Sequence, residues 1–287
     1  GSVVERYRFI QVECAMYPIY LLCKVMEVSR SGFYDWKRRP KTNHDRLLVD
    51  IRSIHRESRG TYGVPRLFLK LKEAGHSVGR HTVQKLMRQE RLFGLPINRK
   101  KYRSPKVSHE DLVKQHFSAE RPNQIWCCDI TQKRTREGWI YLAVVLDLYA
   151  RRIVGWATAS NMTTDLPMKA LNQALILRGN PTGVIHHSDR GSQYTSEQYL
   201  KRQETAGLHT SFGSAGTCLD NAVVESFFSV LKRECLHRQS WTSKREIEEA
   251  IRDYIERFYN RTRIRGNGKT PLQSEQCYYQ KFAQACA

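Results

Sequence analysis

Three acidic residues, each next to a regular run of apolar residues, constrain this chain more than any other feature. Asp129 follows the strand-like run 124–128, and Asp189 follows a second strand-like run that begins at Gly183. Glu225 stands inside a helix-like run, and 35 residues separate it from Asp189. Because strand ends and a neighbouring helix meet at one edge of a sheet, the sequence predicts that the three carboxylates converge.

Converging carboxylates make a site for hard divalent cations, which prefer oxygen ligands. Two such ions about 4 Å apart can hold the attacking and the leaving oxygens of a phosphodiester displacement. The carboxylates repel one another, and bound cations let all three stay charged. A single acid is more often a solvated residue or a helix cap, and we interpret Asp220 as an N-cap. Asp147 is an alternative member of the site, although its position suits a strand end or hairpin.

The segments around the three acids resemble the integrase-core motifs of insertion-sequence transposases. These segments are WCCDIT around Asp129, HHSDRGSQY around Asp189 and DNAVVESFFSVLKRE around Glu225. The resemblance is to the IS-three family, whose two overlapping reading frames are joined by ribosomal frameshifting, and the spacing is also a mark of retroviral integrases. It covers the chain from about Ala15 to about Gln276.

The hydrophobic pattern and the resemblance together predict an α/β, ribonuclease-H-like integrase core. Three strand-like runs between 124 and 160 are followed by a helix that ends at Gly179, a buried strand at 183–189, a helix that ends at Gly207 and a short strand at 208–212. The order is βββαβαβα, with a mixed five-stranded sheet. All-α helix-turn-helix segments precede this core.

The resemblance implies a DNA transposase that works by two-metal phosphodiester displacement. Asp129, Asp189 and Glu225 would hold two Mg²⁺ or Mn²⁺ ions. Water would first cut a strand at the element's end, and the freed 3′-hydroxyl would then attack a second phosphodiester. Lys232, seven residues after Glu225, would contact the end DNA. Its alternative is an ordinary exposed lysine, and Arg233 could share the contact.

The same resemblance implies the partners of the chain. These are double-stranded DNA, as transposon ends and as target, and a homodimer or larger assembly that pairs two ends and joins one beside the other to make a circle. The first-frame product is a further partner. Other residues of the matched motifs would support the acids or contact DNA: His187, Ser188, Gln193, Tyr194 and Asn221.

The charge of the chain points to a polyanion. The net charge is +20 and the isoelectric point is about 9.8, which favours phosphate contact and counterion release. Residues 1–119 hold 25 Lys and Arg against 11 Asp and Glu. A membrane surface is the alternative partner, but no basic amphipathic helix with a broad apolar face and no run long enough to span a bilayer stands out. Eight scattered cysteines without CxxC spacing indicate a reducing compartment, so we expect a soluble, cytoplasmic, nucleoid-associated bacterial protein.

Five segments are expected along the chain: a helix-turn-helix-like segment at 1–40, a second one at 41–95, a basic linker at 96–119, the catalytic core at 120–240, and an amphipathic helix with a tail at 241–287. The alternative for each helical segment is an ordinary helix bundle with a solvated basic face. The candidate DNA contacts of these segments are Lys37, Arg38, Arg80, Lys85 and Arg88, with Arg99, Lys100 and Lys101 in the linker.

The last segment carries an apolar stripe at helical spacing over 242–264, behind a capping box of Ser243 and Glu246. Its end, FYNRTR, is similar to the family's FYNxxR segment. The family's usual His-Ser-Leu-Gly run is replaced by RGNGKTPLQSEQ, and this departure leaves the contacts of the tail open.

Two other functions are compatible with parts of the sequence. A nuclease of the same fold, such as a junction resolvase or ribonuclease H, does not predict the helix-turn-helix segments or the 35-residue spacing. A DNA-binding regulator with a vestigial core does not require the three acids.

Overall fold

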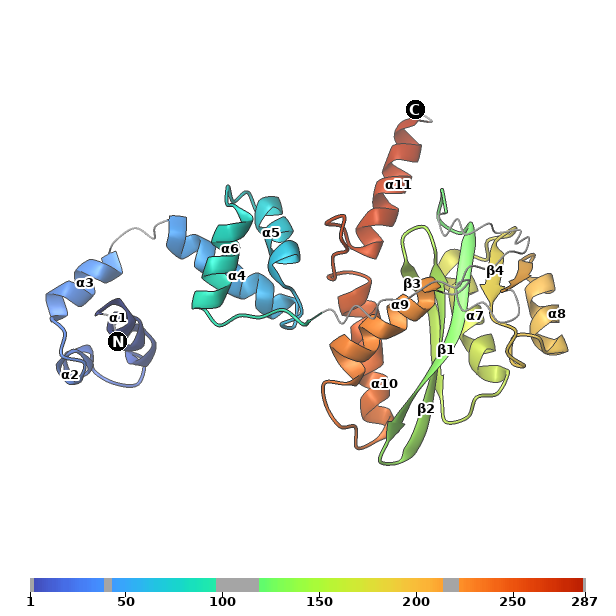
Figure 1. Ribbon diagram of the computed structural model, residues 1–287, viewed down its shortest axis with the longest axis horizontal. Helices are drawn as coiled ribbons and strands as arrows, with labels where there is room; N and C mark the ends of the chain where they lie inside the picture. The colour runs from blue at the N-terminus through green and yellow to red at the C-terminus, as the bar shows by residue number, and fades with distance from the viewer. Residues whose placement is uncertain (1–2, 39–42, 97–118, 214–221, 286–287) are drawn as a thin grey trace, which may run out of the picture. The chain divides into compact units, whose positions relative to one another are not determined.

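A computed structural model describes residues 3–38, 43–96, 119–213 and 222–285 (Figure 1). The chain divides into two compact units, Gly1–Arg52 and Ser53–Ala287. Within the described ranges, no helix is long and apolar enough to cross a membrane. The predicted linker contacts Arg99, Lys100 and Lys101, the predicted cap Asp220 and the motif residue Asn221 fall outside these ranges.

Three short helices form most of the first unit: α1 (Val3–Glu13), α2 (Ile19–Val25) and α3 (Arg30–Arg38). Phe33 is fully buried among side chains of α1 and α2, including Ile10 and Cys23. Ser29 caps α3, because its Oγ accepts a hydrogen bond from the Gly32 amide at 3.0 Å. The sequence predicted a helix-turn-helix-like segment at 1–40, and the structure has three helices here.

The next helices are α4 (Asn43–Glu57), α5 (Val64–Glu73) and α6 (Arg80–Gln89). Pro65 occupies the first turn of α5, where its missing N–H costs nothing. Gly75 follows α5 with a φ of 85°, which a glycine adopts without strain. The apolar faces of α5 and α6 are buried; their buried residues are Leu67, Leu71, Val83, Leu86 and Met87.

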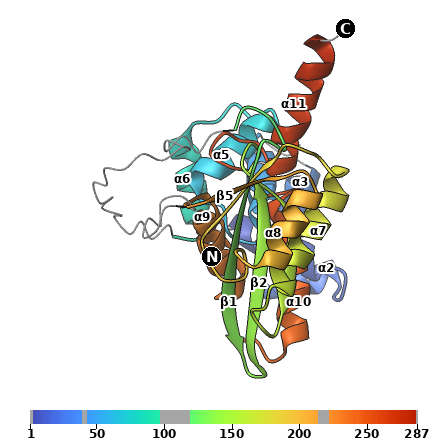
Figure 2. The ribbon, with the colours of Figure 1, turned by 90° about the vertical axis from the view of Figure 1, so that its right-hand side faces the viewer.

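A mixed five-stranded sheet organises the rest of the chain (Figures 1 and 2). The strands are β1 (Ile125–Thr135), β2 (Gly138–Asp147), β3 (Arg152–Ala159), β4 (Ile185–Ser188) and β5 (His209–Phe212). Their spatial order is β3-β2-β1-β4-β5. Strands β1, β2 and β3 pair antiparallel, whereas β4 is parallel to both β1 and β5. The predicted order of strands and helices is confirmed.

Helices cover both faces of the sheet because its central strands alternate between two cores. Ala143 and Val145 of β2 face the core under α7 (Asp165–Arg178) and α8 (Glu197–Thr205). Val144 and Leu146 face the other core, under α9 (Ala222–Leu231) and α10 (Lys244–Arg252). Helix α7 lies so close to β3 that any side chain at Gly155 would collide with the backbone oxygen of Ala170.

The C-terminal third departs from the sequence prediction. Instead of one helix over 242–264, α10 continues as a π-helical segment, η3 (Asp253–Tyr259), and a separate helix, α11 (Pro271–Ala285), follows. Helix α9 likewise continues into a π-helical turn, η2 (Lys232–Leu236). The capping box is only half formed: Ser243 accepts from the Glu246 amide at 3.1 Å, but the Glu246 carboxylate accepts from the Thr242 amide.

His186 predicts a pH dependence of folding. It is fully buried on β4, with Nε2 3.0 Å from the Tyr199 hydroxyl, and burial lowers its pKa from 6.5 to about 4. The unfolded chain therefore binds this proton first, so the stabilising effect of the neutral ring is present above pH 6.5 and is lost as the pH falls to 4. The loss amounts to about 3 kcal/mol.

Urea unfolding between pH 4 and pH 7.5 tests this expectation. The His186→Gln variant should be less stable than the parent at pH 7.5, but its stability should fall less steeply with acid, by about 3 kcal/mol over this range. Parallel stability curves for the two proteins would show that His186 is not the titrating group.

Candidate active site

Asp129 and Asp189 come from neighbouring parallel strands. The register pairs Ile125 with Ile185 and Cys127 with His187, so the same offset sets residue 129 opposite residue 189. Strand β4 ends just before this point, and the Asp189 side chain is exposed. The sequence placed Asp129 at the end of its strand, whereas β1 continues to Thr135 and it is β4 that ends beside Asp129.

Glu225 lies on α9, which packs on β1. Val224, Phe227 and Phe228 are buried beneath the sheet. These apolar contacts fix one face of α9, and they leave Glu225 exposed on the other face.

The charges of the other two acids act on Asp129. The pKa of Asp129 is raised to about 7, first by burial and then by the negative charges of Asp189 and Glu225. A hydrogen bond from the Ile130 amide at 2.7 Å and the charge of Lys232 oppose this rise. Asp129 therefore lies where a carboxylate needs additional positive charge to remain ionised at neutral pH.

A tight turn orients Asp189. Its Oδ1 accepts a hydrogen bond from the Gly191 amide at 3.0 Å. A Cβ at position 191 would lie 3.0 Å from that same oxygen and 3.2 Å from the Gln193 Oε1. Glycine is thus the residue that lets the turn close around the carboxylate. Arg190 donates from Nε to the Gly213 carbonyl at 3.1 Å and ties the turn to the end of β5.

The donor set suits a hard divalent cation, because it consists of carboxylate oxygens that repel one another in the absence of a cation. In the part of the chain that the structure describes, no three His, Cys, Asp or Glu side chains stand close enough together to hold a metal ion. Asp129 is nevertheless near enough to Asp189 and Glu225 for its pKa to respond to both.

Basic side chains adjoin the acids. Lys232 begins the turn η2, seven residues after Glu225, and its charge acts on Asp129. The pKa of His237 is lowered by burial and by the positive charges of Lys133 and Lys232. Arg233 is turned towards the protein, with Nη2 3.9 Å from the Glu234 carboxylate. The positive charge of Lys232 therefore acts on both Asp129 and His237.

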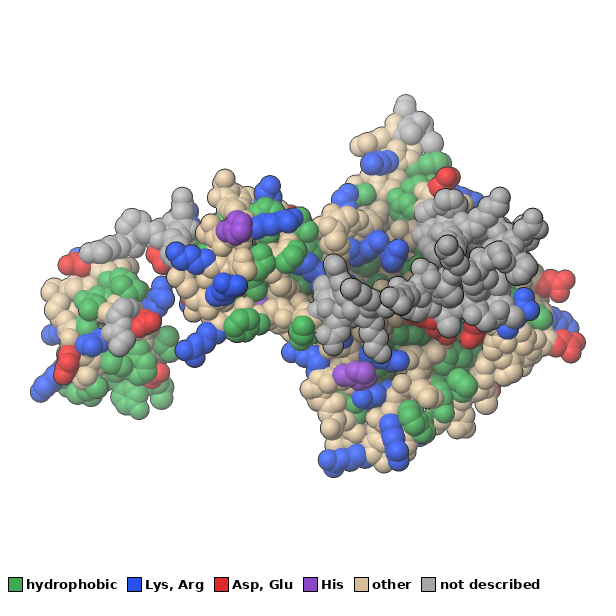
Figure 3. All heavy atoms as spheres, in the orientation of Figure 1, with side chains coloured by type: hydrophobic (Ala, Val, Ile, Leu, Met, Phe, Trp, Pro, Cys, Tyr) green, Lys and Arg blue, Asp and Glu red, His purple; other side chains and the backbone are tan. Residues whose placement is uncertain are grey.

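The candidate DNA contacts in the described helices are on the surface. Arg80, Lys85 and Arg88 are exposed on α6, and Lys37 and Arg38 are exposed at the end of α3. Lys and Arg side chains are spread over the surface of the helices α4 to α6 in Figure 3. The Arg80 guanidinium lies 5.2 Å from the centre of the Phe68 ring, which presents it at the start of α6.

Two motif residues have partners within the protein. Tyr194 is buried against His186 and Tyr199, so the side chain supports the strand rather than contacting DNA. His187 Nδ1 lies 3.0 Å from the Ser211 hydroxyl of the neighbouring strand.

Asp147, the alternative member of the site, has a different role. Its carboxylate is fully buried at the end of β2, where it accepts hydrogen bonds from the Asn123 and Tyr149 amides and pairs with Arg178 at 3.3 Å. Arg178 and Arg152 also pair with Glu275 of α11. These buried ions attach the C-terminal helix to the sheet, and nothing in the hydrophobic pattern signalled them.

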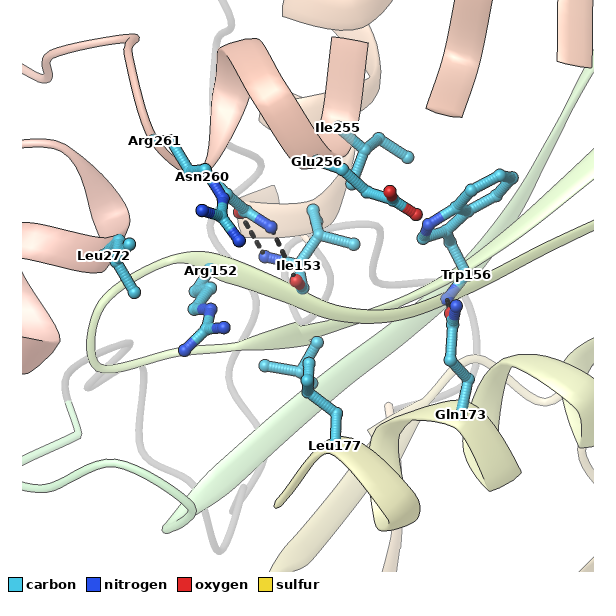
Figure 4. Close-up of a pocket in the computed structure, with 11 residues that line it drawn as sticks. Arg152, Ile153, Trp156, Gln173, Leu177, Ile255, Glu256, Asn260, Arg261 and Leu272 are labelled. Carbon is cyan, nitrogen blue, oxygen red and sulfur yellow. Dashed lines mark hydrogen bonds between the residues drawn. The ribbon is translucent and has the colours of Figure 1, made fainter. Parts of the chain in front are cut away.

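The FYNRTR motif has structural roles that the sequence did not reveal. The Asn260 side-chain amide accepts from the Ile153 N–H at 3.1 Å and donates to the Ile153 carbonyl at 2.9 Å, which closes the edge of β3 (Figure 4). On the same edge, the main-chain amide of Trp156 donates a hydrogen bond to Gln173 Oε1 at 2.6 Å. A pocket of about 250 Å³ lies here, and none of the three acids lines it.

Comparison with known proteins agrees with the fold and the motifs. Integrase core domain models match residues 119–218 and 225–278, and an HTH-like domain model matches residues 42–102. Fold, motifs and domain matches together define a DDE-type integrase-core enzyme with an attached helical DNA-binding region.

Two similar proteins align with almost the whole chain. The chain is 37% identical over 290 residues to the transposase InsF for insertion sequence IS3A of Escherichia coli (strain K12), covering 94% of this chain and 98% of that protein. It is 39% identical over 274 residues to the insertion element IS600 uncharacterized 31 kDa protein of Shigella sonnei, covering 91% of this chain and 100% of that protein. The chain belongs to the IS3 family of insertion-sequence transposases, and its activity is DNA transposition.

One solved structure is also similar. The HTLV-2 integrase catalytic core domain in complex with magnesium aligns with a TM-score of 0.42 at 19% identity, over 54% of this chain and 98% of that chain. A likeness of this size adds nothing to the relationship that the sequences establish.

Proposed function

We propose that Asp129, Asp189 and Glu225 are the catalytic residues of this transposase and that together they hold two Mg²⁺ or Mn²⁺ ions. The observation that carries the proposal is the position of Asp129 on a strand parallel to the one that ends before Asp189, with Glu225 on the helix that packs on β1. The strand register that sets residue 129 opposite residue 189 supports the same grouping.

The bound cations would lower the pKa of a water molecule and neutralise the charge that develops on the leaving oxygen. The protein's own groups orient the reaction. The Ile130 and Gly191 amides hold the two aspartates by one hydrogen bond each. Lys232 binds a phosphate of the end DNA beside the scissile bond, and its charge adds to the stabilisation of the transition state.

Two displacements follow one another at this site. In the first, water forms a bond to the scissile phosphorus and the bond to the 3′-oxygen breaks, which leaves a 3′-hydroxyl and a 5′-phosphate. In the second, the freed 3′-hydroxyl forms a bond to another phosphorus and displaces that phosphate's own 3′-oxygen. The same acids serve both steps, and the protein forms no covalent bond to DNA.

DNA recognition is assigned to the helical segments and to the linker. The chain is divided into the five segments predicted from the sequence. Helix α6 enters a groove of the DNA, and Arg80, Lys85 and Arg88 are its contacts with the DNA. A homodimer or larger assembly would pair two transposon ends. First-strand transfer would then join one end beside the other to make a circle. The first-frame product is a further candidate partner of the chain. The transposase would act in the bacterial cytoplasm, at the nucleoid.

The salt dependence of DNA binding tests the proposed role of α6. Removing both Lys85 and Arg88 by alanine substitution should reduce the slope of log K against log salt concentration by about 1.8, because each lost phosphate contact removes about 0.9. Lys281 on α11 is a matched control, since it is equally exposed and is not assigned to DNA. An unchanged slope in the double variant would mean that α6 does not contact phosphates.

A strand-transfer assay separates the proposed chemistry from the alternatives. The purified chain should convert a labelled duplex that carries the terminal repeat of its element into cleaved and then joined products when Mn²⁺ is added. Cleaved product without any joined product would favour a nuclease. Binding without either product, unaffected by Asp189→Asn, would favour a regulator.

A further inference from the structure

An ion pair is buried at the C-terminal end of α9, the helix that carries Glu225. Glu234 belongs to the π-helical turn η2 and is 4% exposed, and Arg263, from the segment after η3, is 5% exposed. Arg263 donates from Nε to Glu234 Oε2 at 2.7 Å and from Nη2 to Oε1 at 2.9 Å. The Tyr254 hydroxyl donates to the same carboxylate at 2.8 Å.

Net stability does not explain such a pair. Two charges taken out of water recover through their attraction about what their desolvation costs, and an apolar pair of the same size often stabilises a fold as well. A planar, bidentate pair does, however, fix one relative geometry of the two groups. The Glu234–Arg263 pair therefore specifies where the turn η2 lies on the core.

The neighbours of the turn point to the same function. The His237 amide donates to the Lys232 carbonyl at 2.7 Å, and Trp241 Nε1 donates to the Leu236 carbonyl at 2.9 Å. The first of these is the π-helical bond of the turn itself, the second ties the end of η2 to the buried Trp241, and Glu234 fixes the middle of the turn. π-helical turns inside α-helices occur frequently at functional sites, and this one begins with Lys232, whose charge reaches Asp129.

The segment before α5 reinforces the pair from its other side. The Tyr62 hydroxyl donates to the Thr262 carbonyl at 3.1 Å and accepts from the Ile264 amide at 2.7 Å, so it holds the backbone on both sides of Arg263. Arg66 of α5 lies 4.0 Å from the Glu234 carboxylate. One buried carboxylate is therefore in contact with both the catalytic helix and the helical segment proposed to bind DNA.

We infer that Glu234 is a positioning residue for strand cleavage and joining: its bidentate pair with Arg263 holds the turn that presents Lys232 beside Glu225 and Asp129. The inference rests on the roles proposed above for Glu225 and Lys232. A displaced turn leaves all three acids in the protein but moves Lys232 away from the phosphate it binds, and a misplacement of about 1 Å at such a site reduces a rate by about 10²-fold.

The test compares Glu234→Gln with Glu275→Gln. Each variant removes one charge from a buried carboxylate–arginine pair of similar exposure, but Glu275 lies on α11 and its partners, Arg152 and Arg178, belong to β3 and α7. Single-turnover cleavage of the labelled terminal-repeat duplex is measured with saturating protein and Mn²⁺, well below both unfolding midpoints. Glu234→Gln should cleave about 10²-fold more slowly than Glu275→Gln, although the two lose similar thermal stability.

Equal cleavage rates in the two variants would overturn the inference and leave Glu234 as a structural residue alone. If Glu234→Gln does not fold, Arg263→Lys decides, because lysine keeps the positive charge and loses the bidentate geometry. That variant should cleave at least about 10-fold more slowly than the parent, and parental cleavage would contradict the inference. Glu225→Gln in the same assay distinguishes the two levels: if Glu225→Gln still cleaves, the proposed active site itself fails.

Discussion

Replacing Asp129, Asp189 or Glu225 by the matching amide is expected to abolish cleavage and strand transfer, by about 10³-fold or more in rate. An amide keeps the size of the side chain but removes the charge that a divalent cation needs from its ligand. Binding of end DNA should persist, because each change also removes a negative charge that repels phosphate. The measurement is the rate of product formation from a labelled duplex with Mn²⁺, beside the dissociation constant for the same duplex.

Asp165→Asn is the matched control for these three variants. Asp165 is an exposed acid at the start of α7, and its replacement should leave the rate unchanged. If any one of the three amide variants cleaved DNA as fast as this control, that residue would not be a catalytic ligand.

Arg178→Met is expected to destabilise the chain by about 3–5 kcal/mol at neutral pH. Arg178 is 5% exposed and pairs with Asp147, which is fully buried, and with Glu275, which is 5% exposed. The substitution leaves the buried Asp147 without its cation and leaves Glu275 with Arg152 alone. Urea unfolding at pH 7 measures the effect, and Arg245→Met, which breaks a pair whose arginine is 89% exposed, should cost less than about 1 kcal/mol.

The destabilisation by Arg178→Met should shrink in acid. Burial pushes the pKa of Glu275 up, but the hydrogen bonds and charges of Arg178 and Arg152 exceed that effect and hold the pKa below 4.5. The stabilisation by the pairing of Glu275 with Arg178 is therefore fully present above pH 4.5. It is lost as the pH falls through the lower pKa that Glu275 has in the folded protein. A loss below about 1 kcal/mol at pH 7 would show that the three charges do not depend on one another.

Much of the catalytic domain could be predicted because its elements are apolar and regular. The runs around Trp126, Val144 and Ile185 carry strand periodicity, and Gly179 and Gly207 mark the helix ends with the positive φ that glycine favours. The placement of residue 129 opposite residue 189 follows from the parallel pairing of β1 and β4. Where each strand stops does not follow from this pattern, and β1 runs six residues further than the apolar run before Asp129 suggests.

The features that were missed depend on buried charge and on irregular helices. In the sequence, Glu234 and Arg263 look like solvated surface residues. Each can be buried only because it pairs with the other, which lies 29 residues away in the chain. Helix α11 mixes polar and apolar residues and is anchored through the ion pair of Glu275. The π-helical turns η2 and η3 interrupt a periodicity of 3.6 residues that the sequence otherwise maintains.

A structure of this transposase with its terminal-repeat DNA and Mn²⁺, with the ions located by anomalous scattering, tests the central claim most directly. The account predicts two Mn²⁺ ions beside the scissile phosphate, with carboxylate oxygens of Asp129, Asp189 and Glu225 all within about 2.1 Å of an ion. Ions bound beside that phosphate by other residues, or a Glu225 that stays out of reach with DNA in place, would contradict it.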